Sequence, residues 1–152
     1  MEASPVSDLA SHRPQVRPAL PADAAGLQDL FARSMLGAAW MPAGVVPDTD
    51  FAQNSQGEAV WVCAEPAGPV LGLIAVYAAG GFIHHLYVAP EAQGRGIGRA
   101  LVDSLDAWLP RPWRLKCVIA NQAALAFYAR TGWVETGRDR GSQGEYAVLR
   151  RF

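Results

Sequence analysis

Short apolar runs, separated by turn-forming residues, fill much of the first part of the chain. Four runs stand out, at residues 15–19, 59–65, 69–78 and 82–88. Runs of this length that end at glycine or proline are typical of strands. The segment from Pro66 to Pro69 and the pair Gly80-Gly81 have the composition of turns. The last three runs therefore predict two consecutive hairpins.

Apolar residues recur at helical spacing in other segments. One such set has spacings of four, four and three: Ile97, Leu101, Leu105 and Trp108. This spacing predicts an amphipathic helix that packs against a sheet. Asp23 is expected to cap an earlier helix, and Asp48 a short second one. A later helix is predicted from its cap at Asn121 to about Thr131, with Gly132 at the stop position.

A strand at residues 114–119 and a closing hairpin that ends in residues 145–151 complete the pattern. The order of elements is then β-α-α-β-β-β-α-β-α-β-β, which predicts an α/β fold built on one mixed sheet. We expect residues 15–152 to form a single domain. Residues 1–14 are polar, contain two prolines and show no periodicity, so we expect a flexible N-terminal tail there.

The composition argues against several classes of partner. The chain has 152 residues, 51% of them hydrophobic and 18% charged, and a formal net charge of −1. No overall positive field recruits nucleic acid or an anionic membrane, and no segment approaches the length of a membrane span. Cys63 and Cys117 lie in apolar runs without metal-ligand spacing. We therefore expect buried thiols, no metal and a cytoplasmic location.

The most unusual segment is the glycine-rich turn from Gln93 to Arg99, which joins a predicted strand to a predicted helix. The first backbone N–H groups of a helix have no intrahelical partner and carry a partial positive charge. Glycines let that backbone approach a bulky anion, and Arg95 and Arg99 add positive charge. The segment has the features of a cradle for a pyrophosphate.

Spacing separates this turn from two better-known phosphate-binding loops. A dinucleotide-binding turn needs G-x-G-x-x-G. If Gly94 and Gly96 are the first two glycines of this pattern, the place of the third glycine is occupied by Arg99. A nucleoside-triphosphate loop needs Gly-Lys-Ser/Thr, which is absent from the turn. What remains is Gln-x-x-Gly-x-Gly, formed by Gln93, Gly96 and Gly98. Taken alone, this pattern is also compatible with a connection that serves only close packing.

Two segments resemble the GNAT superfamily of N-acetyltransferases. The run LYVAPEAQGRGIGRALV resembles the family's acetyl-CoA motif, and NQAALAFYARTGW resembles a second family motif, with Trp133 in place of the usual phenylalanine. The opening VRPALPADAAGLQDLF resembles the first strand and helix of the family. The resemblance extends from about Val16 to the C-terminus. It implies a central mixed, twisted sheet with a splayed strand pair, flanked by about four helices.

The resemblance also implies a co-substrate, acetyl-CoA, and the residues that hold it. Its pantetheine arm is expected to pair with the strand segment Leu86, Tyr87 and Val88, where the splay leaves backbone groups unpaired. Its pyrophosphate is expected on Gln93, Gly94, Arg95, Gly96, Ile97, Gly98 and Arg99. By the same analogy, Asn121 hydrogen-bonds the pantetheine and Tyr128 points at the sulfur.

Amide formation requires two proton movements. The attacking amine must lose a proton, and the departing thiolate must gain one. The resemblance implies Tyr128 as the acid, although an aromatic at the edge of the core is the alternative. For the base we expect His84, because serotonin-acetylating members carry a histidine at its position. Their second histidine falls at Phe82 here, so a hydrogen-bonded structural His84, or a water relay from another residue, remains open.

The alternation of side chains along a strand bears on the two adjacent histidines. Neighbouring side chains of a strand face opposite sides, so at most one of His84 and His85 is expected to face the site. His84 shares its predicted face with Leu86 and Val88. The sequence thus predicts that His85 points away.

The resulting interpretation is an acetyl-CoA-dependent N-acetyltransferase that acts by direct transfer to a primary amine. Neither cysteine has the setting of a nucleophile, and Tyr128 favours an enzyme over the alternative, a noncatalytic acyl-CoA-binding sensor or docking module. The expected partner is a small-molecule or peptide amine, with the protein a monomer or homodimer. Residues 37–48 and 135–146 are expected to shape the acceptor pocket, but acceptor and acyl length stay open.

Overall fold

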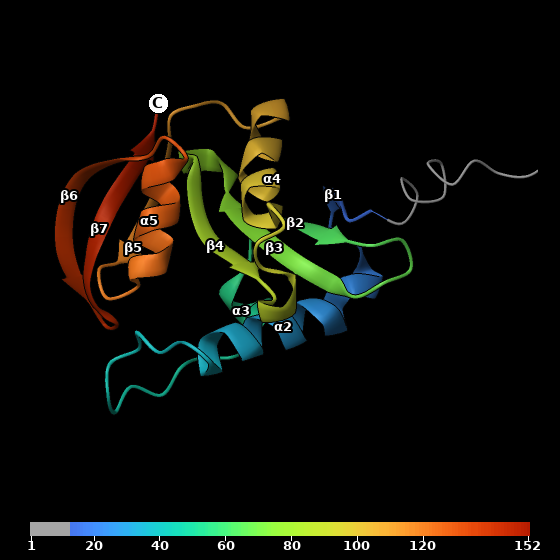
Figure 1. The fold of residues 1–152 in the computed structure, drawn as a ribbon, viewed down its shortest axis with the longest axis horizontal. Coiled ribbons are helices and arrows are strands. Elements are labelled where there is room, and N and C mark those ends of the chain that lie inside the picture. The colour runs from blue at the N-terminus through green and yellow to red at the C-terminus, as the bar shows by residue number, and fades with distance from the viewer. Residues whose placement is uncertain (1–12) are drawn as a thin grey trace, which may run out of the picture.

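One mixed sheet of seven strands runs through the protein, in the order β1-β2-β3-β4-β5-β7-β6 (Figure 1). The computed structural model describes residues 13–152, so most of the predicted N-terminal tail, residues 1–12, lies outside the described residues. The strands are β1 (Gln15–Pro18), β2 (Ala59–Ala64), β3 (Val70–Tyr77), β4 (Phe82–Val88), β5 (Trp113–Val118), β6 (Val134–Gly141) and β7 (Gly144–Arg151).

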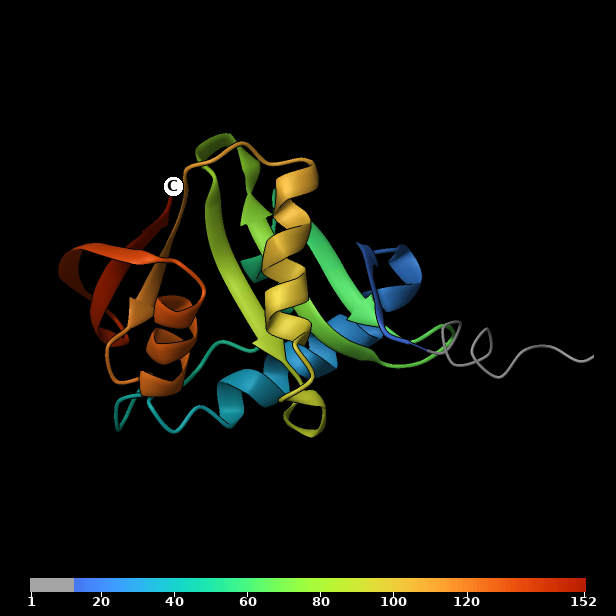
Figure 2. The same cartoon turned by 45° about the horizontal axis from the view of Figure 1, so that its top comes forward.

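Among residues 13–152, four α-helices flank this sheet. They are α2 (Ala24–Leu36), α3 (Phe51–Asn54), α4 (Ile97–Asp103) and α5 (Gln122–Arg130). Figure 2 shows α4 and α5 in front of the sheet and α2 crossing behind it. The order of strands and helices along the chain is the predicted one. Within the described residues, no helix is both long enough and apolar enough to cross a membrane.

Two helices differ from their predicted form. The cap of α3 is Asp50 rather than Asp48: the Asp50 carboxylate accepts a hydrogen bond from the backbone N–H of Gln53 at 3.1 Å, while Asp48 accepts one from the N–H of Asp50. The helix after the glycine-rich turn is α-helical only to Asp103 and continues as a 3₁₀ turn, Ser104–Ala107. Helix ends commonly tighten in this way.

The core lies on both faces of β3, whose residues are buried up to Val76. Leu30 and Phe31 of α2 are almost completely buried, as is Leu101 of α4. A Cβ on Gly72 of β3 would lie 2.8 Å from Ile97 Cγ2 of α4, so the glycine allows α4 to pack closely on the sheet. This packing fixes the position of the turn that leads into α4.

The parallel strands β4 and β5 separate soon after they meet. They pair only at Phe82 and Arg114, whereas β5 pairs with β7 along its whole length. The remainder of β4 diverges from β5, as both views show (Figures 1 and 2). The predicted splay is therefore confirmed, and it leaves one edge of β4 unpaired in the middle of the sheet.

A β-bulge interrupts β4 at the two histidines. Ala75 and Val76 are consecutive in β3, yet they pair with His85 and Ile83, so His84 is an extra residue in β4. A bulge breaks the alternation of side chains, and the two imidazole rings lie with centroids 3.8 Å apart. Both histidines line the same pocket. The prediction that they face opposite sides, with His85 pointing away, is wrong for this reason.

Candidate active site

A cleft of about 690 Å³ opens where β4 and β5 separate. We call it the wide cleft. It is lined by eleven of the twelve residues predicted to hold the co-substrate: Leu86, Tyr87, Val88, Gln93, Gly94, Gly96, Ile97, Gly98, Arg99, Asn121 and Tyr128. Arg95 is the exception, since it does not line the cleft and is exposed.

The unpaired edge of β4 presents backbone groups to this cleft. The N–H of Ala89 donates to the carbonyl of Leu71 on the β3 side at 2.8 Å. In an antiparallel ladder, a residue whose backbone N–H and C=O groups point at the partner strand is followed by one whose groups point away from it. The backbone N–H and C=O groups of Leu86 and Val88 therefore face the gap. They are available to an extended ligand that carries amide groups.

The glycine-rich turn forms one end of the cleft. Gly94 and Gly96 have positive φ angles of 82° and 76°, and a Cβ on either would meet no atom within 4 Å. The N–H of Ala100 bonds to the carbonyl of Gly96 at 3.0 Å, so the three N–H groups before it have no intrahelical partner. Open space beside free N–H groups fits an anion.

Asn121 and Tyr128 line the cleft from α5. The side-chain oxygen of Asn121 caps this helix by accepting from the N–H of Ala124 at 3.3 Å, and its amide N–H groups remain for a ligand. The Tyr128 ring contacts Phe127 and Trp133 edge-on and is 8% exposed. Burial, with smaller contributions from the nearby Cys117 and Tyr87, raises the pKa of Tyr128. Its hydroxyl therefore keeps its proton at neutral pH.

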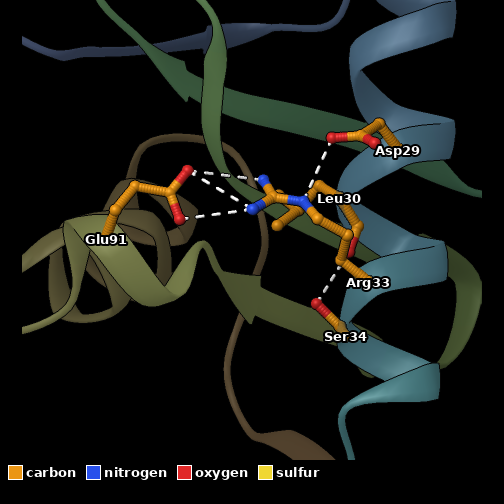
Figure 3. Close-up of polar contacts among 5 residues, drawn as sticks. All are labelled: Asp29, Leu30, Arg33, Ser34 and Glu91. Atoms are coloured by element: carbon orange, nitrogen blue, oxygen red, sulfur yellow. Dashed lines mark hydrogen bonds and ion pairs between the residues drawn. The ribbon is translucent and has the colours of Figure 1, made fainter.

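Arg33 is a residue of the cleft that sequence reasoning missed. It lies on α2 and lines the wide cleft beside Ser34. Figure 3 shows its guanidinium between two carboxylates, with Nη1 3.2 Å from Glu91 and Nε 3.1 Å from Asp29. Glu91 lies directly before the glycine-rich turn, in the 3₁₀ turn Pro90–Ala92. The ion pair thus ties α2 to that turn, although 58 residues separate the partners.

A second cavity of about 370 Å³, the small pocket, shares one lining residue with the wide cleft, Tyr87. Its lining is mixed: Phe31, Met35, Asp48, Asn54, Phe82, His84, His85, Tyr87, Lys116, Val118, Gly141, Ser142, Gln143, Gly144 and Tyr146. Both loop segments predicted to shape an acceptor pocket contribute to it. Glu135 and Glu145 of the second segment do not line it and instead pair with Arg138.

His84 has a carboxylate partner that the sequence did not indicate. Its Nδ1 lies 2.8 Å from Oε2 of Glu58, whose side chain is only 3% exposed. One ligand atom from each of Glu58, His84 and His85 lies within 4.8 Å of the others, and these residue types suit zinc. A ring N–H on Nδ1 of His84 and Oε2 of Glu58 can satisfy each other as donor and acceptor without an ion.

His85 packs among apolar groups on the same side of the sheet. Its ring contacts Phe31 and Phe51 edge-on, and Nε2 lies 3.3 Å from the carbonyl oxygen of Asn54. Burial, together with the neighbouring His84, lowers the pKa of His85 to about 4. His85 is therefore neutral in the folded protein at pH 7.

A neutral, buried His85 should make stability depend on pH. Between the ordinary histidine pKa of about 6.5 and the folded value of about 4, the unfolded chain binds a proton that the folded chain does not. The free energy of unfolding should fall by up to about 3 kcal/mol as the pH drops through this window. Denaturant titrations of wild type and His85→Gln, whose amide still reaches Asn54, measure this contribution. An equal acid-dependent loss in both proteins would contradict it.

Comparison with known proteins supplies an independent view of the chain. The profile of the acetyltransferase (GNAT) family matches residues 25–133. A GCN5-related N-acetyltransferase from Kribbella flavida superposes with a TM-score of 0.69 at 21% identity, over 91% of this chain and 97% of that one. A putative acetyltransferase from Salmonella typhimurium, solved with acetyl-CoA, gives 0.69 at 21% identity, over 90% and 92%.

A third structure, a phosphinothricin acetyltransferase from Sinorhizobium meliloti in complex with acetyl-CoA, gives a TM-score of 0.65 at 21% identity. It matches over 91% of this chain and 88% of the other. At such identities these likenesses establish the fold, and the profile match establishes the family.

Proposed function

The chain belongs to the acetyltransferase (GNAT) family, and we propose that it transfers the acetyl group of acetyl-CoA to a primary amine by direct attack of that amine on the thioester. The position of the two cavities, which share Tyr87 as a lining residue, supports this proposal most strongly. The wide cleft has the groups that an acyl-CoA needs, and the small pocket has room for an acceptor.

We propose the wide cleft as the binding site for acetyl-CoA, which supplies an activated thioester. The free backbone groups of Leu86 and Val88 would pair with its pantetheine amides, and the side-chain amide of Asn121 would add a hydrogen bond. The N–H groups of the glycine-rich turn would hold its pyrophosphate. Of these strand groups, an N–H near Val88 would instead stabilise the oxyanion that develops on the thioester carbonyl.

His84 is the proposed base on the acceptor side. It lines the small pocket and is 42% exposed in its side chain, so it is open to a proton from an incoming ammonium group, directly or through a water molecule. Tyr128 is the proposed acid on the cleft side. Its raised pKa keeps the proton on the hydroxyl, where it can be given to the departing sulfur.

Release of free thiol from acetyl-CoA across a panel of primary amines tests the proposal. The panel should include amino acids, polyamines, aromatic amines and N-terminal peptides, because the acceptor is defined only by its amine. Thiol release that depends on one of these amines is the expected result. Tight acetyl-CoA binding with no release across the panel would instead favour a noncatalytic acyl-CoA-binding module.

His84→Gln should lower the rate at neutral pH by roughly 10- to 100-fold. This is the low end of the rate contribution of a general base, because water can still accept a proton from the amine. Glutamine is chosen because its amide can still donate to the buried Glu58. The loss should shrink at high pH, where the amine is already deprotonated. Rates measured from pH 6 to 10 check this, and an unchanged pH profile would place the base elsewhere.

A further inference from the structure

Glu58 is a buried carboxylate with a single hydrogen-bond partner for its side chain among the described residues. It lies directly before β2, 26 residues from His84 in sequence. Its side chain is 3% exposed, and Oε1 is buried without a hydrogen-bond partner there. Burying a carboxylate is costly unless it is paired. Oε2, at 2.8 Å from His84 Nδ1, makes the contact that offsets this cost.

The contact with Glu58 bears on which ring nitrogen of His84 carries the proton. An ionised carboxylate can only accept hydrogen bonds. With Glu58 ionised, Nδ1 is the donor in this contact, and the lone pair of the neutral ring is on Nε2. The β-bulge turns this ring toward the small pocket, where it lies against His85. The His84 side chain as a whole is half-exposed, whereas the Glu58 side chain that it contacts is buried.

We propose that Glu58 is a positioning residue for the acetyl transfer: it holds His84 in the tautomer with a proton on Nδ1 and stabilises the imidazolium that forms when Nε2 takes a proton from the amine. This inference rests on the proposed function, because it gives His84 a partner in that reaction. The proton passes from the acceptor nitrogen to Nε2, the Nδ1–H stays in place, and Glu58 remains ionised. The carboxylate never touches the acceptor.

His85 does not share this role. Its Nε2 faces the Asn54 carbonyl, its Nδ1 is buried without a partner, and its lowered pKa opposes uptake of a proton. The bulge brings it close to His84, where it forms part of the wall that holds the ring. Asp48 lines the same pocket but bonds to the backbone of its own loop. Asp48 therefore offers a matched carboxylate that does not contact His84.

Kinetics of Glu58→Gln, His84→Gln and the double variant test the coupling. Glu58→Gln should lower kcat by roughly tenfold or more while acetyl-CoA affinity, and thus the fold, is unchanged. The double variant should be no slower than His84→Gln alone, within about threefold, because Glu58 acts only through that ring. Independent losses that multiply would overturn the proposal, as would a kcat in Glu58→Gln equal to that of wild type.

The tautomer of His84 is a second readout that needs no acceptor. Nitrogen NMR of ¹⁵N-histidine-labelled protein should show the neutral ring protonated on Nδ1 in wild type and in Asp48→Asn. In Glu58→Gln it should show a mixture of tautomers. A wild-type ring protonated on Nε2 would overturn the pairing, even if the Gln variant failed to fold. If the wild-type protein acetylated no amine, the proposed function and the catalytic role of Glu58 would both be wrong. The NMR result would still decide whether Glu58 is paired with Nδ1 of His84.

Discussion

Turnover should fall by roughly 10²- to 10⁴-fold when Tyr128 is replaced by phenylalanine, the range typical of lost acid catalysis. The substitution removes one hydroxyl and keeps the ring that packs against Phe127 and Trp133. Stability and acetyl-CoA affinity should therefore change little. The missing group is the proton for the departing sulfur. A rapid-mixing measurement of the chemical step gives this loss directly, even where product release limits turnover.

Tyr87→Phe is the matched comparison for this variant. Tyr87 lines both cavities, its hydroxyl contacts Met35 Sδ at 3.6 Å, and burial raises its pKa to about 12. It is thus a second protonated phenol, on the lining that the two cavities share. A large loss in Tyr87→Phe with an unchanged chemical step in Tyr128→Phe would transfer the role of the acid to Tyr87. Tyr128 would then be a packing residue.

Gly96→Val should weaken acetyl-CoA binding by roughly 100-fold, which corresponds to about 2.8 kcal/mol. A side chain at this position would fill the open space beside the free N–H groups and keep the pyrophosphate away. Loss of one or two hydrogen bonds to a charged group is enough to account for this magnitude. Isothermal titration of the purified variant with acetyl-CoA measures the change.

Valine also strains a backbone with positive φ, so the affinity needs a control for strain. Gly44 has a φ of 82° and, like Gly96, no atom within 4 Å of an added Cβ, but it lines neither cavity. Gly44→Val should lose a similar amount of stability and keep its affinity. If Gly96→Val is folded and binds as tightly as Gly44→Val, the pyrophosphate lies elsewhere.

The periodicity of apolar residues was sufficient to predict most of the fold. The strand at residues 82–88 has the predicted bounds, and α5 begins directly after its predicted cap, Asn121. These features depend on local sequence, where strand spacing, a capping side chain and a terminating glycine act over a few residues. The cleft residues from β4, the glycine-rich turn and α5 followed from the motifs for the same reason, because each motif is one continuous segment.

The acceptor side could not be predicted in this way. The bulge that places His84 beside His85 appears only in the register between β3 and β4, which no single strand encodes. In the sequence, Glu58 is a polar residue directly before a predicted strand. Its burial arises from the packing of distant segments around it. Arg33 reaches Glu91 from another element. Contacts of this kind are products of the tertiary fold, so only the structure reveals them.

The presence of two cavities that share Tyr87 has a consequence for steady-state kinetics. The wide cleft and the small pocket share this residue but are otherwise lined by different side chains. Two substrates held there would occupy separate volumes and be resident together, with no need for one product to leave first. Reciprocal plots of the initial rate, measured at several fixed amine concentrations, should then give lines that intersect rather than run parallel. An unreactive analogue of either substrate should leave the affinity for the other largely intact.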